Sequence, residues 1–226
     1  MRKNLAIIPA RAGSKRIHKK NIKTFLDKPI VAYSIQLAKE SGLFDEVMVS
    51  TDDTEIAKIA QMHGAHVPFY RSKENSDDFA TLNDVLIETL EKYNELKKSF
   101  HYVCMILPTA PLIRSTTLEK ALSILISGNF DSIRPIVKFS YPIQRAFRCS
   151  EGGEIEMINP EHKTTRSQDL ENAYHDAGQF YWINQGKSLL DDYKGGIIIP
   201  ETEAQDIDTE EDWILAEIKY KLIHKI

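Results

Sequence analysis

The chain has 226 residues, 42% of them hydrophobic, which is enough to bury one substantial core and fits a single domain, 1–226, better than two. With 29 lysines and arginines against 33 aspartates and glutamates, the formal net charge is −4, which excludes a general attraction to nucleic acid or anionic membranes. No apolar run approaches the roughly 18 residues of a membrane-spanning helix, and the two cysteines lack metal or redox spacing. We therefore expect a cytoplasmic protein without membrane or nucleic-acid partners.

The first element is an apolar run of strand length that ends at Pro9. A loop of small residues follows it, interleaved with five cations: Arg11, Lys15, Arg16, Lys19 and Lys20. Small side chains let backbone N–H groups approach an anion, Gly13 can adopt the positive φ that turns these groups inward, and the cations offset phosphate charge. We interpret the loop as an anion site; the alternative is a solvated basic loop. It has neither the Walker nor the dinucleotide-binding spacing.

Helical and strand-like patterns then alternate. A helix is predicted from Pro29 to Gly42, a second buried strand over 46–51, and a second helix to Gly64, with the acidic residues at 52–53 as its cap rather than a metal site. This order predicts a parallel sheet. Ligands of such sheets lie beyond the carboxyl ends of the strands, where the loops after the first two strands should meet.

The middle of the chain continues the pattern. An extended piece over 67–72 precedes a long helix that begins at Thr81. Residues 102–107 are apolar throughout, as expected of a central parallel strand. A capping box at Thr116 and Glu119 predicts the next helix, which ends at Gly128. Beyond residue 131 the pattern changes to strands, predicted over 132–137, 141–148 and 155–158.

Two aspartates stand close together near the carboxyl end. Asp206 and Asp208 lie on one side of an extended segment, with Ile207 turned toward the core. Two carboxylates so placed suit Mg²⁺, which prefers oxygen ligands and binds phosphate as well. The alternative is a lead-in to the final helix, since Thr209 and Asp212 fit a helix cap.

Several of these stretches resemble one family. Ile8-Pro9-Ala10-Arg11-x-Gly13-Ser14-Lys15-Arg16, followed by Lys20-Asn21, is similar to the opening motif of the acylneuraminate cytidylyltransferases, which activate nine-carbon sugar acids. Leu-Pro-Thr-Ala-Pro-Leu at 107–112 resembles their Gln-Pro-Thr-Ser-Pro-Leu. The segments 139–146 and 166–182 resemble most closely the branch that acts on pseudaminic acid.

This resemblance implies a fold and a reaction. The expected fold is a three-layer, Rossmann-like nucleotide-diphospho-sugar transferase fold with a mostly parallel central sheet and a small β excursion at about 139–175 that forms a homodimer. The expected reaction joins CTP and pseudaminic acid to give CMP-pseudaminic acid and pyrophosphate, with Mg²⁺ as cofactor. Synthesis of CMP-N-acetylneuraminate or CMP-legionaminate is the alternative. A glycosyltransferase and a regulatory nucleotide-binding module stay open as other classes. The family suggests surface glycan or flagellin glycosylation as the use of the product.

The resemblance also implies site residues. Nucleotide binding is expected at Ala10, Arg11, Ala12, Gly13, Ser14, Lys15, Arg16, Lys20, Asn21, Arg71 and Thr81. Catalytic roles are expected for Arg11, Lys15, Lys20 and Asp208, and metal binding for Asp206 and Asp208.

The sugar is expected to contact Leu107, Arg166, Gln168 and Tyr174. A planar arginine such as Arg166 suits the carboxylate of a sugar acid. Leu107 stands where the sialic acid enzymes have a glutamine, and its apolar side chain cannot make the same hydrogen bond, which counts against N-acetylneuraminate. The neighbouring His175 is interpreted as non-catalytic.

Overall fold

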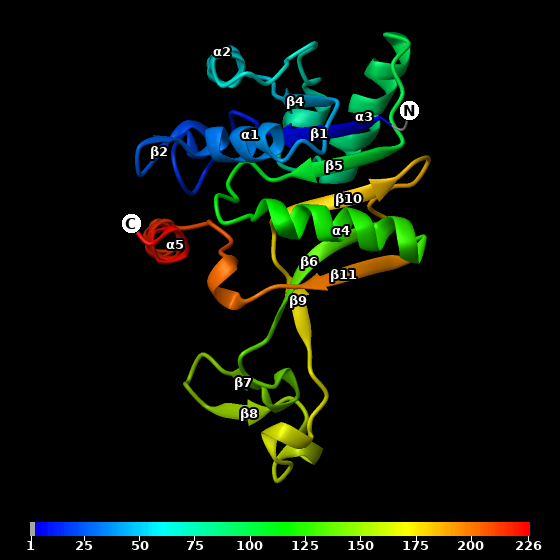
Figure 1. Cartoon of the computed structure of the whole chain (residues 1–226). Helices are drawn as coiled ribbons and strands as arrows, with labels where there is room; N and C mark the ends of the chain where they lie inside the picture. Colours follow the sequence, from blue (N-terminus) through cyan, green and yellow to red (C-terminus); the bar gives the residue numbers. More distant parts are fainter. Residues whose placement is uncertain (1–2) are drawn as a thin grey trace.

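The computed structural model describes residues 3–226. Its centre is a seven-stranded sheet in the order β11-β6-β10-β5-β1-β4, with β9 also paired to β6 (Figure 1). The strands are β1 Asn4–Pro9, β4 Glu46–Ser50, β5 Tyr102–Ile106, β6 Ser132–Lys138, β9 Tyr174–Asp176, β10 Phe180–Asn184 and β11 Lys194–Ile198. Only β9 and β10 run against the common direction of the other five. The mostly parallel α/β sheet is therefore confirmed.

Helices cover both faces of the sheet. Helices α1 (Ile30–Glu40), α2 (Thr54–Met62) and α4 (Ser115–Gly128) pack on one face, and α3 (Leu82–Glu95) packs on the other. Successive residues of β1 serve the two cores in turn, since Ala6 and Ile8 belong to the first and Leu5 and Ile7 to the second. A strand buried on both sides has no polar face, which explains its continuous apolar run.

The final helix, α5 (Glu210–His224), packs at the edge of the molecule. Its Trp213 and Ala216 join Ile207, Phe25 and Tyr33 in a third apolar cluster. Phe25 lies in the short hairpin of β2 (Thr24–Phe25) and β3 (Lys28–Pro29). None of the helices described for residues 3–226 has both the length and the apolar character needed to cross a membrane.

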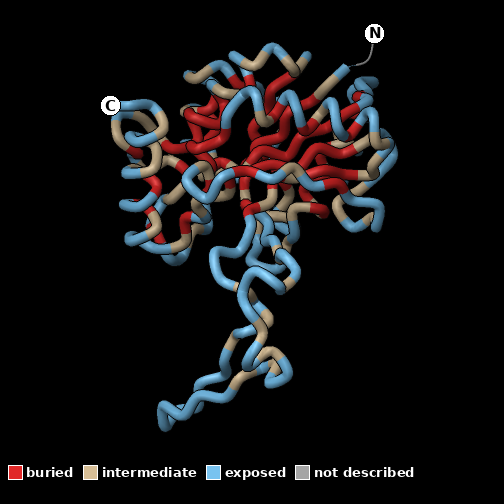
Figure 2. The backbone as a smooth tube through the Cα atoms, turned by 60° about the horizontal axis from the view of Figure 1, so that its bottom comes forward, coloured by how far each residue is buried: buried red, intermediate tan, exposed pale blue. Residues whose placement is uncertain are grey.

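Residues 139–173, between β6 and β9, form an arm that projects from the main body (Figures 1 and 2). The arm holds a two-stranded sheet of β7 (Phe147–Cys149) and β8 (Ile155–Met157), and none of its residues is buried. Short 3-10 helices complete the chain: Lys20–Ile22, Glu74–Ser76, Ile143–Arg145, Pro160–His162, Ser167–Asp169 and Glu201–Glu203. The arm therefore has no core of its own.

Two local predictions are wrong. The capping box at Thr116 and Glu119 is absent, because the N-cap of α4 is Arg114, two residues before Thr116, and it makes no side-chain cap. The strand predicted over 141–148 is replaced by a 3-10 helix at Ile143–Arg145, and strand pairing begins only at β7. Pro142 lacks a backbone N–H and cannot donate to a strand ladder. The predicted caps of α2, α3 and α5 are confirmed.

Candidate active site

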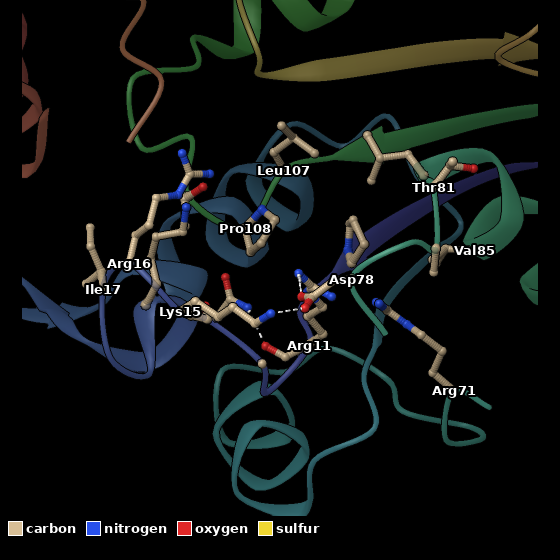
Figure 3. Close-up of a pocket in the computed structure, with 18 residues that line it drawn as sticks. Arg11, Lys15, Arg16, Ile17, Arg71, Asp78, Thr81, Val85, Leu107 and Pro108 are labelled. Carbon is tan, nitrogen blue, oxygen red and sulfur yellow. Dashed lines mark hydrogen bonds and ion pairs between the residues drawn. The ribbon is translucent and has the colours of Figure 1, made fainter. Parts of the chain in front are cut away.

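A cavity of about 410 Å³, the main cavity, opens at the carboxyl ends of β1 and β5 (Figure 3). Pro9 at the end of β1 and Leu107 just after β5 line it. Arg71 also lines it and is held beside β4, since its backbone N–H donates to the Thr51 carbonyl at 2.9 Å. The loops after the first strands therefore meet as predicted.

Most of the predicted nucleotide-binding residues line the main cavity: Arg11, Gly13, Ser14, Lys15, Arg16, Lys20, Asn21, Arg71 and Thr81. Ala10 and Ala12 instead anchor the basic loop (residues 10–20) through their backbone N–H groups to residues that follow β4 or end it. The N–H of Ala10, which is fully buried, donates to the Ser50 carbonyl at 2.9 Å. The N–H of Ala12 donates to the Asp52 carboxylate at 3.1 Å.

The conformation of the basic loop corrects one expectation. Gly13 does not have a positive φ; the left-handed residue of this region is Lys19, with φ 49°. The buried Asn21 amide donates to the Arg11 carbonyl at 2.8 Å, so this side chain shapes the loop. Side-chain hydrogen bonds and the turn at Lys19 set the loop conformation, and the value of glycine at position 13 is its small size.

Asp78 is a feature of the site that the sequence did not reveal. Its carboxylate accepts from Arg11 at 2.9 Å and pairs with Lys15, so that it lies between the two cations in Figure 3. The Lys15 hydrogen bond, with help from Arg11, lowers the pKa of Asp78. Arg11 also donates to the Asp77 carbonyl. Sequence analysis gave Asp78 no role, because nothing in the local sequence shows which loop this segment contacts.

Arg71 is a buried cation at the opposite side of the main cavity from Arg16 (Figure 3). Its guanidinium donates to the Ser50 hydroxyl at 3.1 Å and to the Ser50 carbonyl at 2.6 Å. Burial lowers the pKa of Arg71 to about 10, so the side chain stays charged at neutral pH. A positive charge is thus fixed at the main cavity, which Thr81, the N-cap of α3, also lines.

The loop after Arg71 is anchored by Glu88 on α3, which sequence reasoning also missed. Its carboxylate accepts from the Ser72 N–H at 2.8 Å and the Asn75 amide at 2.7 Å, and pairs with Lys92 at 2.6 Å. Burial alone would raise the pKa of Glu88, but these donors hold it at about 2. The same anchored loop carries Asp78 into the main cavity.

The basic loop directly contacts the carboxyl-terminal aspartates. Lys20 donates to the Ile207 carbonyl at 2.6 Å and lies 3.5 Å from the Asp208 carboxylate. Arg16 pairs with the same carboxylate at 2.9 Å. Ile207 is fully buried, which confirms the predicted alternation along this segment. Residues about 190 positions apart in the sequence therefore meet at one edge of the main cavity.

Asp206 and Asp208 line a second hollow of about 430 Å³, the acidic pocket, together with His175, Asp176 and other residues. Partial loss of solvent and the Asp208 charge raise the pKa of Asp206, although part of its side chain is exposed. Within residues 3–226 no group of three or more acidic, histidine or cysteine side chains could hold a metal alone. Two carboxylates still fit Mg²⁺ when substrate phosphate and water complete its shell.

Comparison with known proteins decides the family. The model of the cytidylyltransferase family matches residues 5–223. The chain belongs to the cytidylyltransferase family. It is 41% identical to the pseudaminic acid cytidylyltransferase of Campylobacter jejuni, over 99% of this chain and 98% of that protein. It is 30% identical to the CMP-N,N'-diacetyllegionaminic acid synthase of Legionella pneumophila, over 94% of both.

A solved structure shares the fold of this cytidylyltransferase. CMP:2-keto-3-deoxy-manno-octonic acid synthetase in complex with CTP aligns with a TM-score of 0.69 over 99% of this chain and 100% of that one, at 15% identity. Identity at this level supports the fold alone. The protein is a nucleotidyltransferase with the expected Rossmann-like architecture.

The predicted sugar-binding residues of the cytidylyltransferase are not brought together in one chain. Leu107 lines the main cavity, and its backbone carbonyl accepts from Ser34 at 2.8 Å. Arg166 and Gln168 lie on the arm, and Tyr174 lies at its base in β9. The residues that line the main cavity in the described chain all lie outside the arm. His175 contacts the Asp176 carbonyl at 2.9 Å through Nδ1 and lines the acidic pocket.

Proposed function

We propose that the protein transfers the cytidylyl group of CTP to pseudaminic acid, giving CMP-pseudaminic acid and pyrophosphate. The observation that carries this proposal is the contact of Arg16 and Lys20, which line the main cavity, with Asp208. One triphosphate can then meet both the basic loop and the aspartates. The close likeness to a pseudaminic acid enzyme supports this sugar; N-acetylneuraminate and legionaminate are the alternatives.

We place the nucleotide in the main cavity, with its phosphates on the basic loop. Arg11, Lys15 and Lys20 would neutralise charge on the β- and γ-phosphates and on the leaving pyrophosphate. The small side chains of Gly13 and Ser14 would let backbone N–H groups reach phosphate oxygens. The base would lie toward Arg71 and Thr81, at the other side of the main cavity.

Asp206 and Asp208 would hold Mg²⁺ at the α-phosphate. When bound, the metal supplies positive charge to the phosphate and lowers the pKa of a coordinated hydroxyl. The raised pKa of Asp206 supports this assignment, because a cation relieves the repulsion between two neighbouring carboxylates. Arg16 and Lys20 orient the Asp208 carboxylate from the nucleotide side.

The chain's own residues would position the reaction rather than form covalent intermediates. The anomeric hydroxyl of the sugar acid attacks the α-phosphorus and its proton is lost to solvent, while pyrophosphate leaves with the bonding electron pair. Fixed geometry and charge stabilisation supply most of the rate enhancement in such transfers. Leu107 would face the less polar part of the sugar.

The arm supports a homodimer in which each arm serves the site of the other chain. It exposes several large apolar side chains, including Tyr141, Phe147 and Ile155, at 84, 55 and 65%. Arg166 and Gln168 would then reach the sugar from the partner. We place the reaction in the cytoplasm, where CTP is made, and expect the product to serve surface glycan or flagellin glycosylation.

Pyrophosphate release from CTP in the presence of pseudaminic, legionaminic and N-acetylneuraminic acids tests this proposal. We expect pseudaminic acid to give by far the highest kcat/KM. Asp208→Ala should lose most turnover and keep its thermal melting profile, because the side chain is at the site rather than in the core. Near-normal turnover of this variant at saturating Mg²⁺ would contradict the metal assignment. Transfer from a finished CMP-sugar without pyrophosphate release would instead indicate a glycosyltransferase.

A further inference from the structure

Helix α5 has apolar side chains on two opposite faces. The inner face buries Trp213 and Ala216 in the third cluster. The outer face leaves large side chains in solvent, with exposed fractions of 57% for Ile214, 47% for Leu215, 56% for Ile218 and 64% for Leu222. A surface helix normally carries one apolar stripe. The exposure of these four residues, the outer stripe, therefore indicates that another surface covers them.

Three of the four outer-stripe residues, Leu215, Ile218 and Leu222, follow the spacing of paired helices. Positions 211, 215, 218 and 222 alternate steps of four and three residues, which keeps them along one side of a helix that faces another helix, and position 225 continues the alternation one residue beyond the helix. Apolar residues occupy the three middle positions. Glu211 occupies the first and Lys225, just beyond the end of α5, the last. The series thus has an apolar centre and opposite charges at its two ends.

The two charged ends of this series are placed symmetrically about Ile218. Ile218 is seven residues from both Glu211 and Lys225, and Ile214 and Leu222 are each four residues from Ile218. An antiparallel second copy with a two-fold axis at Ile218 would place Ile218 against itself and Ile214 against Leu222. Glu211 would then face Lys225. A two-fold interface requires this kind of self-complementarity.

The charges at the ends are available for such contacts. Both Glu211 and Lys225 are exposed, and the ion pairs found within residues 3–226 use neither of them. Figure 1 shows α5 at an edge of the molecule, away from the arm, so a second helix can approach it. A parallel partner would instead place Glu211 against Glu211.

We propose that α5 pairs antiparallel with α5 of a second copy of this chain through the outer stripe. This interface is separate from the arm. A chain with two different two-fold interfaces forms assemblies of more than two copies. The α5 contact should therefore link pairs of chains that the arms have already joined, and it should not alter the reaction itself.

Sedimentation velocity of the full chain over a range of concentrations tests the interface. Ile218→Glu places two negative charges together at the two-fold axis and should weaken the α5-dependent association by at least about tenfold. The matched control is Ile126→Glu on α4, where the same change falls on an isoleucine with 43% exposure. The control should associate as the wild type does. Both variants should keep pyrophosphate release, and equal masses for all three proteins would overturn the proposal.

Charge reversal tests the antiparallel direction. Glu211→Lys and Lys225→Glu should each weaken association, because each leaves like charges facing one another. The double variant Glu211→Lys/Lys225→Glu restores two opposite pairs and should recover the association of the wild type. Failure of the double variant to recover would contradict the proposed register.

A disulfide tests the two-fold axis directly. Ile218→Cys is made in a Cys149→Ser background, because Cys149 is exposed and Cys104 is buried. Mild oxidation should then yield a covalent two-chain species through position 218. If Ile218→Glu weakens association while this cross-link fails and the charge swap gives no recovery, the outer stripe contacts another surface and the proposal is wrong.

Discussion

Asp78 places a carboxylate where the proposed triphosphate would bind. It pairs with both Arg11 and Lys15 in the main cavity, so CTP must displace it before the two cations can contact phosphate. In the absence of nucleotide this carboxylate offsets one of the two positive charges. The affinity for CTP thus reflects a competition between two anions for the same partners.

Asp78→Asn should remove this competition. We expect CTP to bind about two- to fivefold more tightly, since exposed ion pairs are weak, and pyrophosphate to leave more slowly. Isothermal titration with CTP and single-turnover kinetics measure the two effects. Glu91→Gln on the exposed side of α3 is the control for an equal loss of charge. Weaker CTP binding by Asp78→Asn would show that the carboxylate instead holds Arg11 and Lys15 in their productive positions.

The Asp206 carboxylate of the proposed metal site lowers the stability of the folded protein when no metal is bound. Loss of solvent and the Asp208 charge raise its pKa above the usual 3.8, so the folded protein ionises this carboxyl less readily than the unfolded chain does. Below the unfolded pKa the group is neutral in both states and has no effect. Above it, the ionised carboxylate lowers the stability of the folded state.

Asp206→Asn should therefore raise the melting temperature at pH 7 in the absence of metal while it abolishes turnover. The gain should shrink as the pH falls through the pKa and vanish below about pH 3. Thermal melting across this pH range measures it. Asp192→Asn, at an exposed carboxylate, should give no such trend. A lower melting temperature for Asp206→Asn at pH 7 would show that the carboxylate makes favourable contacts that outweigh the repulsion.

At the scale of elements, the basic loop is held by backbone hydrogen bonds at Ala10 and Ala12, whereas Gly13 faces open space. An added Cβ at Gly13 would meet no atom within 4 Å, and the residue does not need a positive φ. Gly13→Ala should therefore fold normally, with a stability equal to the wild type or up to about 1 kcal/mol higher. Its methyl group should keep phosphate away from the loop and weaken CTP binding about tenfold. Unchanged CTP affinity in a titration would show that phosphate does not approach Gly13.

The sequence predicted where individual strands and helices lie along the chain better than it predicted which of them contact one another. Hydrophobic runs identified β1, β4 and β5, and cap residues such as Thr81 and Thr209 identified the starts of α3 and α5. Strand β10 lies antiparallel between β5 and β6, and the pairing was not predictable, because an apolar run carries no sign of its direction. The contact of Asp78 with the basic loop was also not predictable, because a loop sequence does not show which other loop it will contact.

At the scale of the whole molecule, the arm separates the site into two parts. Arg166 lies on a projection without a core, while Lys15 and Arg16 line the main cavity. A single chain does not bring these groups together. The proposed sugar site is therefore complete only if the arm of one chain reaches the main body of another.

Mixing two inactive variants tests this division. Arg166→Ala damages only the arm and Asp208→Ala only the main body, so a hybrid dimer holds one site with an intact body and an intact partner arm. If chains exchange at random, half of the dimers are hybrids with one working site in two, and about one quarter of the wild-type pyrophosphate release should return. Mixing Lys15→Ala with Asp208→Ala is the matched control and should restore nothing, because both changes damage the main body. If the first mixture also stays inactive after chain exchange is verified, each arm serves its own chain or no site at all, and the shared site is excluded.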